Sequence, residues 1–129
     1  MQADSCPFCH LAAADIVATN AFHVVIRDRY PVSLGHSLII PKRHVASLFE
    51  LTTEEFTALY ELLQLTRDQL TQAYAPDGFN IGVNVGAAAG QTVFHLHMHV
   101  IPRYHGDSPD PRGGVRWVMP DKAAYWQEP

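Results

Sequence analysis

The chain has 129 residues, of which 47% are hydrophobic and 17% are charged, a length and composition that indicate one globular domain and not a disordered chain. It carries 13 acidic and 9 basic residues, a formal net charge of −4, and no local run of Lys or Arg, so a nucleic-acid partner is not expected. No apolar stretch reaches the length of a membrane span, and the opening MQADSC lacks the basic and apolar regions of a signal peptide, so we expect a cytoplasmic protein without a membrane partner.

The first motif in chain order is CPFC, which holds the only two cysteines of the chain. The C-x-x-C spacing allows Cys6 and Cys9 to bind one tetrahedral zinc ion. A structural disulfide is not expected in the reducing cytoplasm, and a thioredoxin-like redox pair would follow a strand of a βαβ unit, for which residue 6 is too early. The alternative is a pair of reduced, partly buried cysteines. We expect residues 1–20 to form a zinc-binding N-terminal segment with a short helix.

A long helix is the clearest secondary-structure prediction. Thr52 and Glu55 have the capping-box spacing, and TEEFTALYELLQLTRDQLTQAY follows until APDG ends the helix. An approximate apolar stripe of this helix is expected to face a sheet: Phe56, Leu59, Leu63, Leu70 and Tyr74. Three more aromatic residues are expected in the core: Phe22, Phe49 and Tyr60.

Four segments are predicted to be strands: AFHVVIRD (21–28), HSLIIP (36–41), FNIGVNVG (79–86) and VFHLHMHVI (93–101), the last closed by Pro102. The helix is segregated from strands with short connections, which predicts an α+β fold with an antiparallel sheet. Residues 103–129 are rich in turns but contain Trp117, Tyr125 and Trp126. We therefore expect this tail to pack on the domain or on a partner subunit.

Three histidines alternate with apolar residues in FHLHMHV. In a strand, alternate side chains share a face at a spacing of about 6.5 to 7 Å. His95, His97 and His99 should therefore line one face, opposite a core face made of Phe94, Leu96, Met98 and Val100. Such a row of imidazoles indicates either a metal site or covalent chemistry by one histidine that the others support.

The loop before the histidines, NVGAAAGQTV, is suited to binding an anion. Gly86 and Gly90 let the backbone turn tightly, and Gln91 and Thr92 add an amide and a hydroxyl. It is not a Walker loop, because no Gly-Lys-Ser/Thr follows. Phosphate and histidine together suggest nucleophilic catalysis, in which a neutral imidazole attacks phosphorus through Nε2 while an acceptor holds Nδ1–H.

These motifs resemble the histidine triad (HIT) superfamily of nucleotidyl hydrolases and transferases. HLHMHVI looks like the H-x-H-x-H signature, and IIPKRHVASL and GVNVGAAAGQTVFHLHMHVIPR are similar to the Hint and Fhit branches, so the resemblance covers nearly the whole chain. It implies an HIT-like fold with about five antiparallel strands, one long and one short helix, and a homodimer with a continuous sheet. The tail resembles bacterial members described as diadenosine tetraphosphate hydrolase-like.

The resemblance also implies roles for individual residues. His97 would be the nucleophile, His99 would support the phosphate and the nucleophile, and His36 would be a further active-site histidine. The implied substrate-binding residues are Asp28 at the ribose, Asn84, Gln91 and Thr92 at the phosphate or leaving group, and Phe8 and Leu11 at the base. The implied zinc ligands are Cys6, Cys9, His44 and His95.

The leading interpretation is a nucleotide hydrolase or nucleotidyl transferase that acts on dinucleoside polyphosphates or nucleoside phosphoramidates. It would release AMP or GMP through a nucleotidyl-His97 intermediate, with a structural zinc and no catalytic metal. Two alternatives stay open: a non-catalytic, regulatory nucleotide-binding module, and a metallohydrolase with the three triad histidines around a catalytic zinc. Arg112 and Arg116 would contact either a polyphosphate or a surface or dimer neighbour.

Overall fold

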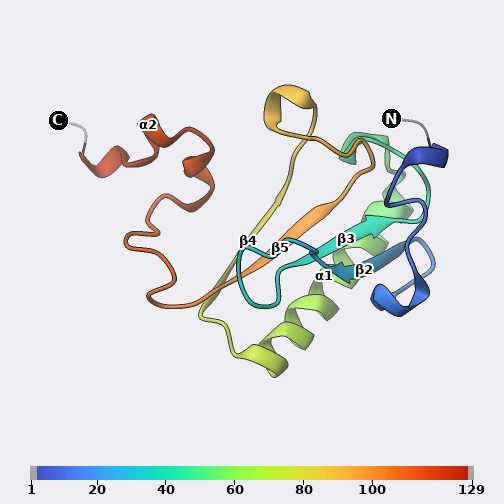
Figure 1. Ribbon diagram of the computed structural model, residues 1–129, viewed down its shortest axis with the longest axis horizontal. Coiled ribbons are helices and arrows are strands. Elements are labelled where there is room, and N and C mark those ends of the chain that lie inside the picture. The colour runs from blue at the N-terminus through green and yellow to red at the C-terminus, as the bar shows by residue number, and fades with distance from the viewer. Residues whose placement is uncertain (1–2, 128–129) are drawn as a thin grey trace.

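The computed structural model describes residues 3–127, which form a five-stranded antiparallel sheet with one long and one short α-helix (Figure 1). The strands and α-helices are β1 (Ile16–Thr19), β2 (His23–Arg27), β3 (Ser37–Pro41), α1 (Thr53–Tyr74), β4 (Gly78–Val83), β5 (Met98–Arg103) and α2 (Pro120–Ala123). Short 3-10 turns are η1 (Ala3–Ser5), η2 (Ala13–Asp15), η3 (Leu48–Glu50), η4 (Ala87–Ala89), η5 (Gly114–Val118) and η6 (Tyr125–Gln127). The predicted α+β class and antiparallel sheet are confirmed.

The strand order is β1-β2-β3-β5-β4, so β5 lies inside the sheet although it comes last in the chain. His99 of β5 is paired with Leu38 of β3 on one side and with Gly82 of β4 on the other. This register places a histidine in the middle of the sheet, with one apolar neighbour and one neighbour that has no side chain.

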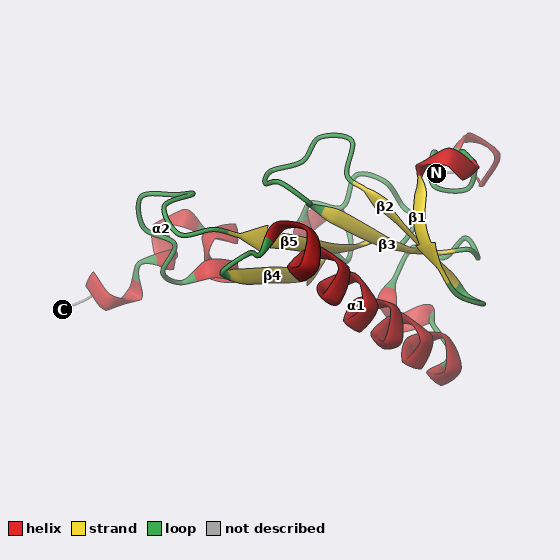
Figure 2. Ribbon diagram, turned by 90° about the horizontal axis from the view of Figure 1, so that it is seen from below, coloured by secondary structure: helices red, strands yellow, loops and turns green. Residues whose placement is uncertain are grey.

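The sheet has two different faces. Helix α1 covers one face, where it packs against a core cluster that includes Val25, Ile39 and Val100 (Figure 2). The opposite face carries a second apolar cluster of Val24, Ile26, Leu38 and Ile40, and the N-terminal residues Phe8, Leu11 and Ile16 pack on it. Because alternate residues of a strand point to opposite faces, His99 shares this second face, away from α1.

Helix α1 begins at the predicted capping box, but its buried stripe differs from the predicted one. The buried positions are Glu55, Leu59, Leu62, Thr66 and Leu70. Thr66 is tolerated in the core because its hydroxyl donates a hydrogen bond to the main-chain oxygen of Leu62 (2.7 Å). The prediction that Phe56 and Tyr74 face the sheet is wrong, since they lie at the margins of the stripe and are 49% and 37% exposed. Two of the other predicted core aromatics, Phe49 and Tyr60, are also exposed, and Phe22 is half-buried.

The start of the helix makes an ion pair that links it to the loop after β3. The Nε and Nη2 atoms of the Arg43 guanidinium donate hydrogen bonds to the Glu55 carboxylate (3.1 and 2.8 Å). Glu55 also accepts from the main-chain N–H of Thr52, which completes the capping box. These contacts lower the pKa of Glu55 to about 2, and the hydrogen bond from Arg43 has the largest effect.

Glu55→Gln should lower the free energy of unfolding at pH 7 by about 1 kcal/mol, because Arg43 is half exposed and solvent screens the pair. Since the folded-state pKa is depressed, this stabilisation is present above the unfolded-chain pKa of about 4.3 and is lost as the pH falls towards 2. Urea unfolding of both proteins at neutral and at low pH measures this: the gap should close in acid. An equal gap at both pH values would show that the charge of Glu55 contributes nothing.

The histidine segment departs from the predicted strand. Strand β5 begins only at Met98, so His95 and His97 precede it. The N–H of Leu96 donates to the main-chain oxygen of Val45 (2.7 Å), which draws this segment to the loop after β3 instead of to a neighbouring strand. The consecutive residues His95 and Leu96 are both buried.

Other strand boundaries also differ. The predicted strand 79–86 ends at Val83, and Pro102 lies inside β5, opposite Phe79, instead of ending the strand. Proline is tolerated there because pairing with β3 already stops at Val100. Residues 1–20, where a short helix was predicted, contain the 3-10 turns η1 and η2 and the edge strand β1.

The C-terminal tail leaves the end of β5 and runs beyond the sheet, on the side opposite the N-terminal segment (Figure 1). It is held mainly by its own contacts. The Nε1–H of Trp117 donates to the main-chain oxygen of Arg112 (2.7 Å), and the Arg112 guanidinium lies over the Trp126 ring. Residues of η5 contact α2 and β4. Packing of this tail on a partner subunit remains a prediction.

Candidate active site and metal centre

Three histidines from two neighbouring segments meet on the face of the sheet away from α1. His36 immediately precedes β3, His97 immediately precedes β5, and His99 lies in β5. The ring centroids of His97 and His99 are 5.2 Å apart, as are those of His36 and His99. The three predicted catalytic histidines therefore form one cluster.

The main chain determines which nitrogen of His97 carries the proton. Its Nδ1 lies 2.8 Å from the carbonyl oxygen of His95, and a carbonyl can only accept a hydrogen bond. Nδ1 therefore carries the hydrogen, and in the neutral ring Nε2 keeps a free lone pair. This is the tautomer that a nucleophilic imidazole requires.

A chain of hydrogen bonds determines the tautomers of His36 and His99. The main-chain N–H of Val32 donates to Nδ1 of His36 (3.1 Å), so the neutral His36 ring carries its hydrogen on Nε2. That Nε2–H points to Nδ1 of His99 at 3.0 Å. His99 consequently accepts through Nδ1 and carries its own hydrogen on Nε2. The cluster thus combines a lone pair on His97 with an N–H donor on its neighbour.

Burial keeps the supporting histidines neutral. It lowers the pKa of His36, against the opposing effect of the Asp28 carboxylate. It also lowers the pKa of His99, where His97 and His36 add to the effect. Both imidazoles are therefore uncharged near neutral pH, and the tautomer argument applies to them.

Asp28 completes the cluster at the end of β2. Its Oδ2 lies 3.4 Å from Nε2 of His36, and its Oδ1 accepts the main-chain N–H of Tyr30 (2.9 Å). Asp28, His36 and His99 have ligand atoms within 4.8 Å of one another, as a metal site would. However, Nε2 of His36 has no lone pair while Val32 donates to Nδ1, so this group is a hydrogen-bonded relay and not a metal site.

The glycine loop precedes the histidine segment in the chain and is stabilised by Gln91. The Gln91 side chain is buried; its Oε1 accepts the N–H of Gly86 (2.9 Å), and its Nε2 donates to the carbonyls of Ala46 and Val93. Gly86 and Gly90 have φ values of 91° and 94°, which disfavour any side chain. The amide of Gln91 is thus used within the protein to shape the loop, not left free for a ligand.

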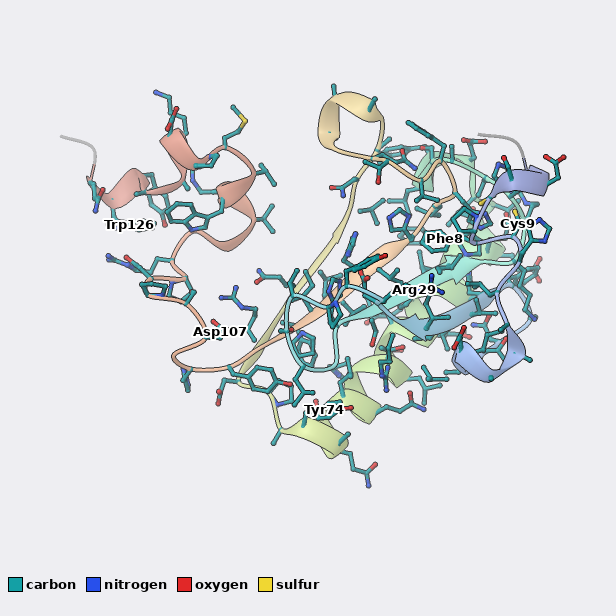
Figure 3. All side chains as sticks on the ribbon, in the orientation of Figure 1. Phe8, Cys9, Arg29, Tyr74, Asp107 and Trp126 are labelled. Atoms are coloured by element: carbon teal, nitrogen blue, oxygen red, sulfur yellow. The ribbon has the colours of Figure 1, made fainter. Side chains whose placement is uncertain are left out.

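The remaining predicted substrate-binding residues differ in their contacts with the histidine cluster. Phe8 packs edge-on against the His97 ring, at 5.0 Å between centroids, and belongs with Leu11 to the apolar cluster on this face (Figure 3). Asn84 follows β4, and Thr92 is exposed at the end of the glycine loop. Within residues 3–127, no hydrogen bond joins either of these two side chains to the histidine cluster.

The two cysteines meet two histidines beside this cluster. The four predicted ligands Cys6, Cys9, His44 and His95 come together, with all ligand atoms within 4.8 Å of one another. Sγ–Nδ1 distances are 3.5 Å for Cys6–His95, 3.4 Å for Cys9–His95 and 3.1 Å for Cys9–His44, and the two Nδ1 atoms are 3.2 Å apart. Ligands of one tetrahedral zinc ion would be about 3.5 Å apart for sulfur–nitrogen pairs and about 3.3 Å for nitrogen pairs.

The chemistry of these donors also fits a cation. Nε2 of His95 lies 2.7 Å from the carbonyl oxygen of Pro41 and must donate to it, which leaves Nδ1 as a lone pair facing the cysteines. Burial, together with the neighbouring Cys6 thiol, raises the pKa of Cys9. A divalent cation would reverse that effect and would satisfy four donors that otherwise face one another.

His95 therefore points away from His97 and His99. Its imidazole belongs to the cysteine–histidine cluster, whereas its carbonyl accepts the hydrogen bond from His97. Within the described residues, no metal-binding group combines His95, His97 and His99. The alternative of a catalytic zinc held by this triad is not supported.

Sequence reasoning missed the groups that orient the histidines. They are main-chain atoms: the carbonyls of Pro41 and His95 and the N–H of Val32. His23, which belongs to none of the predicted motifs, is buried, and its Nε2 donates to the carbonyl of Glu55. No residue type marks such main-chain partners in a sequence.

Comparison with known proteins identifies the family. A model of the HIT domain matches residues 11–106, most of the chain. The chain belongs to the HIT family. It is 36% identical over 103 residues to adenosine 5'-monophosphoramidase hnt1 of Schizosaccharomyces pombe, covering 77% of this chain and 74% of that protein. It is also 35% identical over 94 residues to AP-4-A phosphorylase of Mycobacterium tuberculosis, covering 72% of this chain and 48% of that protein.

Among solved structures, a Zn-bound histidine triad family protein from Mycobacterium smegmatis has a TM-score of 0.74 and 32% identity, with 97% of each chain covered. The predicted HIT-like fold is thus confirmed. Membership in the HIT family, with relatives named as a phosphoramidase and a phosphorylase, supports nucleotide hydrolysis as the general activity. None of the helices in residues 3–127 is both long enough and apolar enough to cross a membrane.

Proposed function

We propose that this protein hydrolyses dinucleoside polyphosphates or nucleoside phosphoramidates at the α-phosphate and releases AMP or GMP. The observation that carries the proposal is the pairing of two tautomers. Nε2 of His97 has a free lone pair because Nδ1–H is bound to a carbonyl, and the adjacent His99 presents an N–H. A nucleophile beside a hydrogen-bond donor is the arrangement that attack on a phosphate requires.

The reaction proceeds in two displacements. Nε2 of His97 forms a bond to the α-phosphorus while the bond to the leaving oxygen or nitrogen breaks, and the leaving group departs with that electron pair. Water then attacks the phosphorus and the bond to His97 breaks. Overall one water is consumed, with its hydroxyl kept by the nucleoside monophosphate and its proton by the leaving group. His99 donates a hydrogen bond to a phosphate oxygen in both steps.

The surrounding residues bind the nucleotide. Asp28, at the open end of the relay, accepts hydrogen bonds from the ribose hydroxyls. Phe8 and Leu11 form the apolar wall for the purine base. The glycine loop, shaped by the bond from the Gly86 N–H to Gln91, borders the phosphate, with Thr92 and Asn84 at its rim.

Zinc is the metal that we assign to the cysteine–histidine cluster. Cys6, Cys9, His44 and His95 would hold it through two thiolates and two imidazoles, a closed donor set that leaves no position for substrate. The ion would stabilise the N-terminal segment and supply no catalytic step. The Zn-bound relative from M. smegmatis supports this choice.

We further propose that the protein acts in the cytoplasm, where the two thiols stay reduced, and that it forms a homodimer with a continuous sheet. Strand β4 is an edge of the sheet, so its outer hydrogen-bonding groups can pair with a second copy.

The test is intact-protein mass spectrometry after brief mixing with diadenosine tetraphosphate or adenosine 5'-phosphoramidate and an acid quench. The expected result is a protein carrying one added AMP, absent from His97→Ala. If nucleotide binds but neither adduct nor product forms, the proposal is wrong and a non-catalytic nucleotide-binding module takes its place.

A further inference from the structure

We propose that Cys6 and Cys9 form a reversible oxidation site, in which a peroxide converts the two thiols into a disulfide and thereby weakens nucleotide binding at the neighbouring histidine cluster. The same step releases the zinc ion that we assign to these residues. The effect on nucleotide binding rests on the proposed function, because it concerns the same site, whereas disulfide formation and metal release do not.

The two cysteines lie at one turn and face the same atom. The N–H of Cys9 donates to the carbonyl of Cys6 (3.2 Å), which closes the turn. Both cysteines are free, and their Sγ atoms lie 3.5 and 3.4 Å from Nδ1 of His95 and within 4.8 Å of each other. A disulfide bond is about 2.05 Å long, so rotation of the two side chains within this turn is enough to join the sulfurs.

Metal binding and disulfide formation exclude each other at this site. Two sulfur ligands of one tetrahedral zinc ion would be about 3.8 Å apart, much farther than two bonded sulfurs. A disulfide sulfur also carries no negative charge, so oxidation removes both anionic donors and leaves only the imidazoles of His44 and His95. Two neutral imidazoles bind zinc far more weakly than the full set of four ligands. Oxidation should therefore release the metal.

The burial of the two thiols determines the order of the reaction. Cys6 is fully buried and Cys9 is half-buried, so a small oxidant such as hydrogen peroxide reaches Cys9 first. The Cys9 thiolate attacks one peroxide oxygen and the oxygen–oxygen bond breaks, which gives a sulfenic acid and hydroxide. The Cys6 thiolate then attacks the Cys9 sulfur, and the sulfur–oxygen bond breaks with loss of a second hydroxide. Two thiolates, one peroxide and two protons thus give one disulfide and two waters, with two electrons passing from sulfur to peroxide.

Two connections join the cysteine pair to His97, the proposed nucleophile. Phe8 lies between the cysteines in the chain, next to Cys9 (Figure 3). Its ring packs edge-on against His95 and His97, at 6.1 and 5.0 Å between centroids. His95 faces the cysteines with Nδ1 and accepts the Nδ1–H of His97 with its carbonyl (2.8 Å). The residues that change on oxidation are therefore direct neighbours of the nucleophile.

The position of Phe8 depends on the two cysteines that flank it. Phe8 and Leu11 pack on the apolar cluster of the sheet face away from α1, and the cysteine–histidine contacts add a polar attachment. Formation of the disulfide draws both sulfurs away from the two imidazoles, so Phe8 shifts together with its neighbours. Because Phe8 forms part of the proposed wall for the purine base, nucleotide binding should weaken roughly tenfold, the effect of losing one base–aromatic contact.

The proposed disulfide is reversible and fits a reducing compartment. A dithiol reduces it by thiol–disulfide exchange, after which the two thiolates can bind zinc again. Disulfides of cytoplasmic proteins are usually transient and sense the redox state. The cysteine pair would thus lower nucleotide binding only while peroxide is present.

The experiment treats the full chain, purified without a histidine tag and loaded with zinc, with limiting hydrogen peroxide. Intact-protein mass without reductant measures the disulfide, a metal-binding dye measures released zinc, and calorimetry measures the affinity for AMP. Cys9→Ala cannot form the disulfide. His10→Ala is the matched control, because His10 is the next residue, exposed and outside the cluster.

The unsubstituted protein and His10→Ala should each lose about 2 Da and release their zinc. Both should then bind AMP roughly tenfold more weakly. A dithiol with added zinc should reverse all three changes. Cys9→Ala should have the weaker affinity from the start and should not respond to peroxide. The cycle of oxidation and reduction on the unsubstituted protein tests the inference even if this variant does not fold.

Several results would overturn the inference. A gain of about 32 Da without a disulfide would mark a sulfinic acid in its place. An unchanged affinity for AMP after zinc release would separate the cysteines from the nucleotide site, and an equal loss in Cys9→Ala would assign the effect to another oxidised residue. Protein with well under one zinc per chain before treatment also overturns it. If the three changes occur in a protein that turns over no nucleotide, only the proposed function is overturned.

Discussion

His97→Ala should lower kcat for nucleotide hydrolysis by on the order of 10⁵-fold, because it removes the atom that forms the bond to phosphorus. The structure gives this histidine one free lone pair, on Nε2, and holds its other nitrogen at 2.8 Å from the His95 carbonyl. His99 has an N–H at the corresponding position and cannot replace the nucleophile while His36 donates to its Nδ1. Steady-state kinetics with diadenosine tetraphosphate measure the change.

The control for this prediction is nucleotide affinity. His97 is half-buried at the rim of the cluster, and its ring contacts Phe8 only edge-on, so the alanine variant should fold and bind AMP within about threefold of the unsubstituted protein. His10→Ala is a matched variant, since His10 is exposed and outside the cluster, and it should retain full activity. Retention of more than about 1% of turnover by His97→Ala would contradict the covalent mechanism.

Local rules predicted the elements whose signals are local. The capping box of Thr52 and Glu55 marks the start of α1, and the apolar runs at β2 and β3 mark strands. The start of the histidine segment was wrongly predicted to be a strand, because an alternation of polar and apolar residues predicts a strand wherever it occurs. A bond from Leu96 to Val45, 51 residues earlier, overrides this preference and takes His95 out of the sheet. Such a tertiary bond has no local signature.

The candidate site, too, could be predicted from the sequence only in part. Sequence reasoning could name His97, His99 and Cys9 because few residue types carry their chemistry. It could not show that His95 serves two clusters, with its imidazole on the cysteines and its carbonyl on His97. That division depends on the chain leaving the strand geometry at this residue. The row that the strand pattern placed on one face is divided in the structure: the His95 imidazole faces the cysteines, whereas the rings of His97 and His99 face each other.

Removal of the proposed zinc ion should destabilise the fold more than any surface substitution. With free zinc at about 1,000 times its dissociation constant, an ion that binds only the folded state contributes about 4 kcal/mol, and its removal should lower the melting temperature by roughly 10 to 20 °C. The cluster ties Cys6 and Cys9, near the N-terminus, to His44 after β3 and His95 before β5. Without the ion, this segment keeps mainly the apolar packing of Phe8 and its neighbours.

Thermal unfolding before and after chelation, with metal analysis of protein purified without a histidine tag, measures this effect. One zinc per chain is expected, lost by the chelated protein. Cys9→Ala should melt at the chelated temperature and show no further response to chelator, because it removes one of four ligands. His10→Ala, changed at the next residue, should keep both its zinc and its melting temperature. A chelator-insensitive protein with well under one zinc per chain would mean that Cys6 and Cys9 are simply reduced thiols packed against two neutral imidazoles.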